Sequence, residues 1–169
     1  MGAGNLALVG SGWHPPLFRE EARSLLESIE VLHPRIVSSS NSDSAVGRIS
    51  RASLIDEAIE STSRLWINDG NISASEIAVH VEEWAQSFLP VGSFAVRARN
   101  LGRGVCDLSR REIEVEIGAR ISGKYRPVDL EDPEFEISVL LAGQDDSSGY
   151  WNDTQQNDLI LWGLRNGKF

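Results

Sequence analysis

The side chains best suited to chemistry are the basic ones, which gather in one segment of the sequence. Residues 97–126 hold eight bases and four acids, a net charge of +4, whereas the remaining residues carry −13 and the whole chain −9. The bases are Arg97, Arg99, Arg103, Arg110, Arg111, Arg120, Lys124 and Arg126. Because arginine forks form bidentate contacts with phosphate, the segment predicts a surface that binds a polyanion such as RNA. The alternative is that these side chains are solvated and paired with neighbouring glutamates.

Histidine and cysteine form no complete catalytic or metal site in the sequence. The three histidines, His14, His33 and His80, lack the spacing of metal ligands. The single cysteine, Cys106, has no following histidine that could activate it as a nucleophile. We therefore predict no catalytic residue and no metal site in this chain, and leave open whether it belongs to an enzyme.

Two short motifs are typical of nucleotide chemistry but are interpreted otherwise. In Gly10-x-Gly12, Pro15 stands where a dinucleotide-binding loop needs its third glycine, so we expect a simple strand-to-helix turn. Asp132-Pro133-Glu134-Phe135 is similar to the catalytic loop of amino methyltransferases. That loop follows a buried apolar strand, whereas acidic residues precede this one, so we reject a catalytic role for it.

Length and composition favour a soluble chain of one medium or two small domains. The 169 residues are 41% hydrophobic and 24% charged, which is ordinary for a globular protein. No run approaches the ~20 apolar residues that cross a bilayer, and the N-terminus lacks the pattern of a signal peptide. A single cysteine excludes a disulfide framework. We expect a cytoplasmic protein.

The first part of the sequence predicts short strands and one helix. An apolar run at 6–9 is typical of a buried strand, and Pro15-Pro16 begins a helix with an apolar stripe to Ile29. Residues 31–38 predict one further strand. Residues 49–66 fit a helix in their first half and a strand in their second, and Asp69-Gly70 marks a turn.

The second part predicts helix, strand, helix, strand and strand in that order. Ser73 with Glu76 forms a capping box before a helical stripe that ends at Phe88. Residues 94–99 alternate between apolar and polar, which places Arg97 and Arg99 on the solvent face of a strand. Residues 112–117 also alternate, yet a capping box at Ser109 favours a helix over 109–123. Strands are expected at 135–141 and 159–164. This order indicates an α+β fold with helices packed on one face of a small sheet.

Three segments of this second part resemble a known RNA-binding module. They are Phe94-Ala-Val-Arg-Ala-Arg99, Arg110-Arg-Glu-Ile-Glu-Val-Glu-Ile-Gly118 and Val128-Asp-Leu-Glu-Asp-Pro133. Together and in this order they resemble the THUMP domain of tRNA-modifying enzymes, over about Ser73 to Leu164. Residues 6–67 are similar to the ferredoxin-like domain that precedes THUMP in archaeal-type tRNA guanosine N2-methyltransferases. The resemblance implies a ferredoxin-like domain at 1–69 and a THUMP domain at 70–169.

The resemblance also implies a function and a set of partners. In such enzymes THUMP binds the acceptor end of tRNA, and a following domain carries S-adenosylmethionine chemistry. The chain ends where the linker to that domain would begin, so the resemblance implies a non-catalytic part or subunit that holds no cofactor itself. Tyr125 and Arg126 are candidates for stacking on a single-stranded RNA end.

Other functions remain open at this point. A stand-alone THUMP adaptor for a tRNA acetyltransferase is the alternative within RNA binding. A protein–protein interaction module could use the five tryptophans as anchors, although core packing explains them as well. An enzyme that acts alone through an unrecognised site is the third possibility.

Overall fold

The computed structural model describes residues 5–10, 15–26, 28–40, 54–67, 72–102, 105, 108–143 and 158–165. Within these residues the chain forms three helices and seven strands, the predicted α+β class. It divides into two compact units, one built mainly from residues up to Thr62 and the other from Ser63–Gln144 and Gln156–Leu164. The predicted domain boundary at Asp69-Gly70 lies outside the described residues and stays a prediction.

The first unit is an antiparallel sheet with one helix packed on it. Its elements are β1 (Asn5–Gly10), α1 (Pro15–Leu25), β2 (Glu30–His33), β3 (Ile36–Ser39) and the first part of β4 (Ile55–Ile67), and its strands follow the order β2-β3-β1-β4. Phe18 of α1 is fully buried in the core of this unit. A side chain at Gly10 would collide with the Phe18 ring, so packing accounts for this glycine without a bound nucleotide.

The structure corrects one local prediction for this unit and resolves one ambiguous stretch. Residues 31–38 form two strands of a hairpin and not one strand, because the chain turns at Pro34-Arg35. Proline has no backbone N–H to continue a ladder, which favours a turn there. The ambiguous stretch at 49–66 is a strand from Ile55 onward, since β4 pairs antiparallel with β1, with two irregularities in the ladder.

The second unit has the predicted order of elements. α3 (Ala74–Phe88), β5 (Phe94–Leu101), α4 (Arg110–Ile121), β6 (Phe135–Ala142) and β7 (Asp158–Arg165) follow one another. The strand order is β4-β7-β6-β5, so β5 is an edge strand. β5 and β6 run parallel and α4 lies in the connection between them, whereas β6 and β7 are antiparallel.

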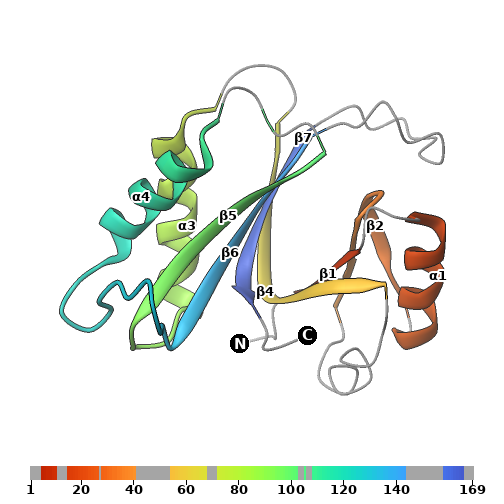
Figure 1. Ribbon diagram of the computed structural model, residues 1–169, viewed down its shortest axis with the longest axis horizontal. Coiled ribbons are helices and arrows are strands. Elements are labelled where there is room, and N and C mark those ends of the chain that lie inside the picture. Colours follow the sequence, from red (N-terminus) through yellow and green to blue (C-terminus); the bar gives the residue numbers. More distant parts are fainter. Residues whose placement is uncertain are drawn as a thin grey trace. The chain divides into compact units, whose positions relative to one another are not determined.

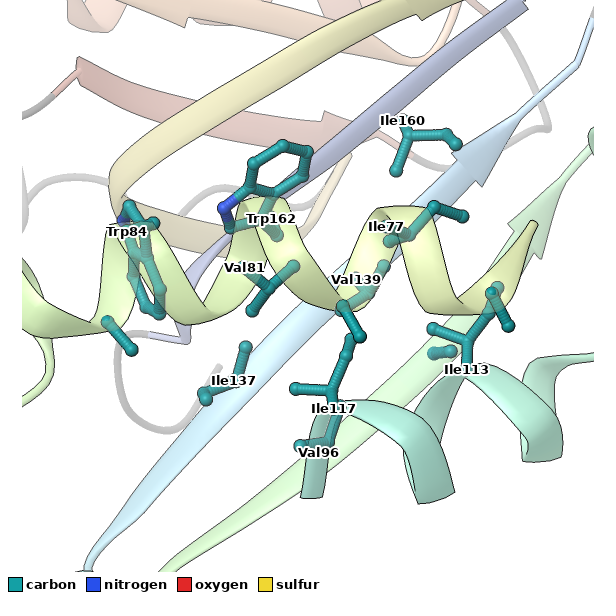
Figure 2. Close-up of a cluster of buried hydrophobic side chains, with 14 of the residues drawn as sticks. Ile77, Val81, Trp84, Val96, Ile113, Ile117, Ile137, Val139, Ile160 and Trp162 are labelled. Carbon is teal, nitrogen blue, oxygen red and sulfur yellow. The ribbon is translucent and has the colours of Figure 1, made fainter. Parts of the chain in front are cut away.

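Both helices of this unit lie side by side against one face of its sheet (Figure 1). Figure 2 shows the core between them, where apolar side chains from α3, α4 and the strands meet. The labelled members are Ile77, Val81, Trp84, Val96, Ile113, Ile117, Ile137, Val139, Ile160 and Trp162. Burial of each large apolar side chain contributes about 1.5–3 kcal/mol, so this core holds α4 firmly on the sheet.

Both helices begin after the predicted N-cap serine, but the predicted capping box is complete only at Ser73 and half-formed at Ser109. At Ser73 the capping box is complete, with the hydroxyl accepting from Glu76 N–H and the Glu76 carboxylate accepting from Ser73 N–H. At Ser109 the hydroxyl accepts from Glu112 N–H over 3.3 Å. The choice of helix over strand for 109–123 is therefore confirmed. Within the described residues, no helix is both long and apolar enough to cross a bilayer.

Candidate nucleic-acid interface

A pocket of about 480 Å³ lies between α4 and the outer edge of β5, entirely within the second unit. β5 supplies Phe94, Val96 and Arg97 to its lining. α4 and its C-cap supply Arg111, Glu114, Val115, Gly118, Ala119 and Ser122. The segment after α4 completes it with Val128 and Leu130. The pocket therefore combines apolar walls with two arginines.

The outer edge of β5 is partly covered by the chain itself. Ser93 C=O accepts from Phe135 N–H of β6, so odd-numbered residues of β5 direct their backbone groups to β6 and even-numbered residues direct theirs outward. Phe94 N–H donates to Pro127 C=O over 3.0 Å, and Phe94 C=O accepts from Asp129 N–H over 2.9 Å. The segment 127–129 thus adds a short parallel bridge to the edge.

Further along the same edge, a side chain of α4 takes the place of a neighbouring strand. The Glu114 carboxylate accepts from Ala98 N–H through Oε2 over 2.8 Å. Between this contact and the bridge at Phe94, Val96 is the residue whose backbone N–H and C=O point outward. The edge is consequently closed on both sides of Val96, and the pocket opens at this point.

One face of α4 points to the pocket and the other to the core. Arg111, Glu114, Val115 and Gly118 follow the i, i+3, i+4, i+7 spacing of a single helix face. Val115 is 60% exposed, whereas Ile113 and Ile117 on the opposite side are fully buried. A Cβ at Gly118 would contact only Val128 Cγ2, at 3.9 Å. Gly118 therefore leaves open space where almost any other residue would fill it.

The loop after α4 is held in place by two sets of hydrogen bonds. The Arg97 Nη2 atom donates to Leu130 C=O over 3.0 Å. The Asp129 carboxylate accepts from the N–H groups of Glu131 and Asp132 over 3.0 and 3.1 Å. These contacts keep Val128 and Leu130 at the pocket, where they are 45% and 64% exposed.

Three of the predicted RNA-binding residues are brought together around this pocket. Arg97 and Arg111 line it, and Arg110 and Arg111 line an adjoining pocket of about 410 Å³ that also includes Ser109 and Glu114. Arg110 and Arg111 are exposed, and among the described residues neither guanidinium has a hydrogen-bond or ion-pair partner. Both also stand in the first turn of α4, whose N-terminal amides attract anions.

The other predicted binding residues lie elsewhere or have contacts within the protein. Arg99 is half-buried on β5, and Arg103 falls outside the described residues. Arg120 Nη1 lies 3.3 Å from Glu82 Oε1 of α3. Arg126 donates to Leu89 C=O over 2.6 Å and to Pro90 C=O over 3.3 Å, at the C-terminal end of α3. For these residues a role in RNA binding stays a prediction.

The two residues suggested for stacking are also placed. Tyr125 is 66% exposed, and Lys124 Nζ lies 5.6 Å from the centre of its ring. This ring is available on the surface, but it does not line the pocket at β5. Arg126 faces the end of α3 as described above.

The predicted binding residues are cations and Tyr125, and they do not include Glu114 and Gly118, which also line the pocket. A signal existed in the helical spacing of Arg111, Glu114 and Gly118, which places them on one face. That this face borders an open sheet edge depends on β5 being the outermost strand, which no local pattern shows. Among the described residues, no group of three or more His, Cys, Asp or Glu side chains is arranged to hold a metal.

Three solved structures share the fold over nearly the whole chain. TrmN from Thermus thermophilus is matched at 20% identity and a TM-score of 0.61, covering 97% of this chain and 46% of that protein. PH1313 from Pyrococcus horikoshii Ot3 is matched at 17% identity and a TM-score of 0.58, covering 96% and 55%. A 4-thiouridine synthetase in an RNA complex with bound ATP is matched at 14% identity and a TM-score of 0.50, covering 96% and 41%.

These likenesses confirm the fold that the resemblance predicts: the chain has the α+β fold of a THUMP-containing protein. The chain spans about half the length of the solved proteins that it matches. No protein-family model matches the sequence, and no curated protein is significantly similar to it.

Proposed function

We propose that this chain binds RNA at the β5 edge and serves as the tRNA-docking part of a base-modifying enzyme. The observation that carries the proposal is the convergence of the three segments that resemble THUMP. Phe94, Val96 and Arg97 come from the first, Arg111, Glu114 and Gly118 from the second, and Val128 and Leu130 from the third. Segments that lie apart in the sequence thus build one pocket, which is the arrangement expected of a binding site.

The charges around the pocket favour a phosphate-bearing ligand. Arg97 lines the pocket beside Glu114, donates to Leu130 C=O and lies 3.9 Å from Glu136 Oε1. Arg110 and Arg111 supply the exposed basic surface at the first turn of α4. The α4 dipole adds partial positive charge in the same place. Because the sequence outside residues 97–126 carries −13, RNA is repelled by most of the chain and is expected to dock in a single orientation.

The finer function follows from the sequence resemblance and from one structural neighbour. The RNA complex of the 4-thiouridine synthetase places an RNA-bound protein among the neighbours of this fold. The resemblance to tRNA guanosine N2-methyltransferases favours the acceptor end of tRNA as the ligand. S-adenosylmethionine would then belong to a catalytic domain or partner subunit, and this chain would supply the docking surface. An adaptor for a tRNA acetyltransferase remains the second candidate on the same resemblance.

Equilibrium binding of tRNA by the purified chain tests the proposal. We expect the dissociation constant to rise with salt, with a log–log slope of roughly 0.7–0.9 for each phosphate contact. Removal of the single-stranded 3′ end should weaken binding. Two results would overturn a specific tRNA-docking role. One is an affinity for tRNA that does not change with salt, and the other is an affinity for tRNA no higher than that for a DNA duplex of equal length. Transfer of a labelled methyl group from S-adenosylmethionine by the pure chain would show instead that it acts alone.

A further inference from the structure

We propose that Glu114 is a specificity-determining residue, which makes the pocket prefer cytosine over uracil in single-stranded RNA. The inference rests on the proposed RNA-binding function and adds base selection to it. It follows from three features of the pocket: the limited length of open sheet edge, the fixed position of the Glu114 carboxylate, and the apolar walls around it.

The open edge is too short for an added peptide strand, which favours a base as the occupant. Strand addition needs several consecutive backbone positions along the edge. Here the bridge of residues 127–129 closes the edge at Phe94, and Glu114 occupies the N–H of Ala98. Only Val96 remains between them. A pocket of about 480 Å³ next to a single open residue suits a nucleotide better than an extended peptide.

Glu114 is held so that it presents an acceptor to the pocket. Its Oε2 atom accepts from Ala98 N–H over 2.8 Å, which fixes the carboxylate against the sheet edge. An ionised carboxylate has two oxygens with about four acceptor positions, so one bond leaves most of this capacity unused. Glu114 lines both neighbouring pockets. A ligand in the pocket therefore meets a preorganised hydrogen-bond acceptor.

An acceptor at this position discriminates between the two pyrimidines. Cytosine carries an N4 amino group, and carboxylates accept hydrogen bonds from it. Uracil has the O4 carbonyl at the same position, and two acceptors facing each other repel. One charge-assisted hydrogen bond gained or lost corresponds to about tenfold in affinity.

The rest of the pocket fits a base and its phosphate. Val115, Val128 and Leu130 are apolar, partly exposed and able to pack on the flat faces of a ring. Gly118 leaves the space between α4 and Val128 open. Arg111 stands at the same pocket and can bind an adjoining phosphate, whereas Arg97 is held by Leu130 C=O at the pocket wall. Apolar faces, one fixed acceptor and flanking cations are the elements of single-stranded RNA recognition.

The variant Glu114→Gln tests the assignment because it replaces a hydrogen-bond acceptor at the pocket by a donor, in a side chain of nearly the same shape. The amide oxygen can still accept from Ala98 N–H, which leaves the NH₂ group as a donor toward the pocket. We expect the native chain to bind an oligocytidylate of about eight nucleotides roughly tenfold more tightly than an oligouridylate of the same length at about pH 7.5. In Glu114→Gln this ratio should fall to one or below.

Glu116→Gln is the matched control, because it removes the same charge from the same helix outside the pocket. Both substitutions remove a negative charge that repels RNA, so the affinity for either oligonucleotide can rise in both variants. The test therefore compares the ratio of the affinities for oligocytidylate and oligouridylate. An unchanged ratio in Glu116→Gln supports the inference. A ratio that changes equally in both variants overturns it, since charge alone would then account for the effect.

A second variant locates the base. Gly118→Leu fills the open space beside Val128 and replaces glycine by a strong helix former, so the fold is expected to persist. Loss of oligonucleotide binding with unchanged thermal unfolding supports the pocket as the binding site, and unchanged binding overturns it.

Equal affinities for the two oligonucleotides in the native chain overturn base selection but leave RNA docking intact if salt-dependent tRNA binding persists. If tRNA binds and neither oligonucleotide does, the tRNA docks without a base in this pocket and the inference fails. Absence of tRNA binding as well defeats the proposed function itself.

Discussion

The two ends of α4 carry the same type of side chain in different circumstances. At its first turn, Arg110 and Arg111 are exposed and have no hydrogen-bond or ion-pair partner among the described residues. At its last turn, Arg120 pairs with Glu82, and Arg126 just beyond it binds the end of α3. A count of arginines treats all four alike. Arg120 and Arg126, like Arg97 with Leu130 C=O, are bound within the protein and contribute to the fold. Arg110 and Arg111 have no such contact among the described residues and are available to a ligand.

The helix dipole sharpens the contrast. A cation in the last turn of a helix is stabilising, whereas a cation in the first turn opposes the dipole and costs roughly 0.3–1 kcal/mol. The helix dipole therefore stabilises the charge of Arg120 and destabilises the charges of Arg110 and Arg111. We infer that the first pair is retained for binding and the second for structure, and the following variants test this distinction.

The largest effect is expected from the double variant Arg110→Gln with Arg111→Gln. Loss of two phosphate contacts should weaken tRNA binding by about 2–3 kcal/mol, or roughly 30- to 150-fold, and lower the salt slope by roughly 0.7–0.9 per contact. Thermal unfolding should be unchanged or slightly higher, because the unfavourable dipole interaction is removed. Binding titrations at several salt concentrations measure the first effect. Native affinity and slope in the double variant would show that the first turn of α4 is merely solvated.

The substitution Arg126→Met should affect stability and spare RNA binding. It removes the donors to the carbonyls of Leu89, the C-cap of α3, and of Pro90, which follows it. The expected loss is about 1–2 kcal/mol in the free energy of unfolding, as for bonds made by a charged donor. Urea unfolding followed by circular dichroism measures it. A fall in tRNA affinity at full stability would return Arg126 to the binding surface and break the comparison.

Gly118→Ala should separate stability from binding on the pocket face of the helix. Alanine in place of a helix-interior glycine adds about 0.5–1 kcal/mol, and its Cβ would meet only Val128 Cγ2 at an ordinary contact distance of 3.9 Å. The methyl group narrows the pocket, so we expect higher thermal stability together with weaker RNA binding. Stabilisation without any loss of binding would mean that the ligand does not reach Gly118.

The smallest effect is expected from Arg120→Gln, which is also the control for the first variant. The ion pair with Glu82 is formed by side chains that are 39% and 37% exposed. Exposed pairs of this kind contribute at most about 0.5–1 kcal/mol. Unfolding and tRNA binding should both stay close to native values. A loss of affinity as large as that of the double variant would show that total charge, and not position, governs binding.

Much of the second unit could be predicted from the sequence because its signals are local. The Ser73 and Ser109 caps, the helical spacing of Ile113 and Ile117, and the alternation of β6 identify their elements without tertiary information. The hairpin of β2 and β3 was merged into one strand, because a two-residue turn at Pro34 interrupts the apolar pattern only briefly. The domain limits and the role of Arg103 in RNA binding stay predictions.

The candidate site could be predicted only in part. Charge singles out Arg97 and Arg111, and the structure places both at one pocket, while their role in binding stays a prediction. The Glu114 contact with Ala98 N–H could not be predicted, because it requires knowing that β5 is the edge strand and that α4 crosses beside it. The internal bonds of Arg120 and Arg126 are invisible in the sequence for the same reason: their partners lie 38 and 37 residues away.

A map of amide chemical-shift changes tests the central claim most directly. The ¹⁵N-labelled full chain would be titrated with an RNA minihelix that carries a single-stranded 3′ end. We expect the affected amides to gather at the β5 edge, the first two turns of α4 and the loop after it, with Val96, Arg111 and Leu130 among the most strongly shifted. Changes confined to the last turn of α4 and residues 124–126, or to the first unit, would contradict it.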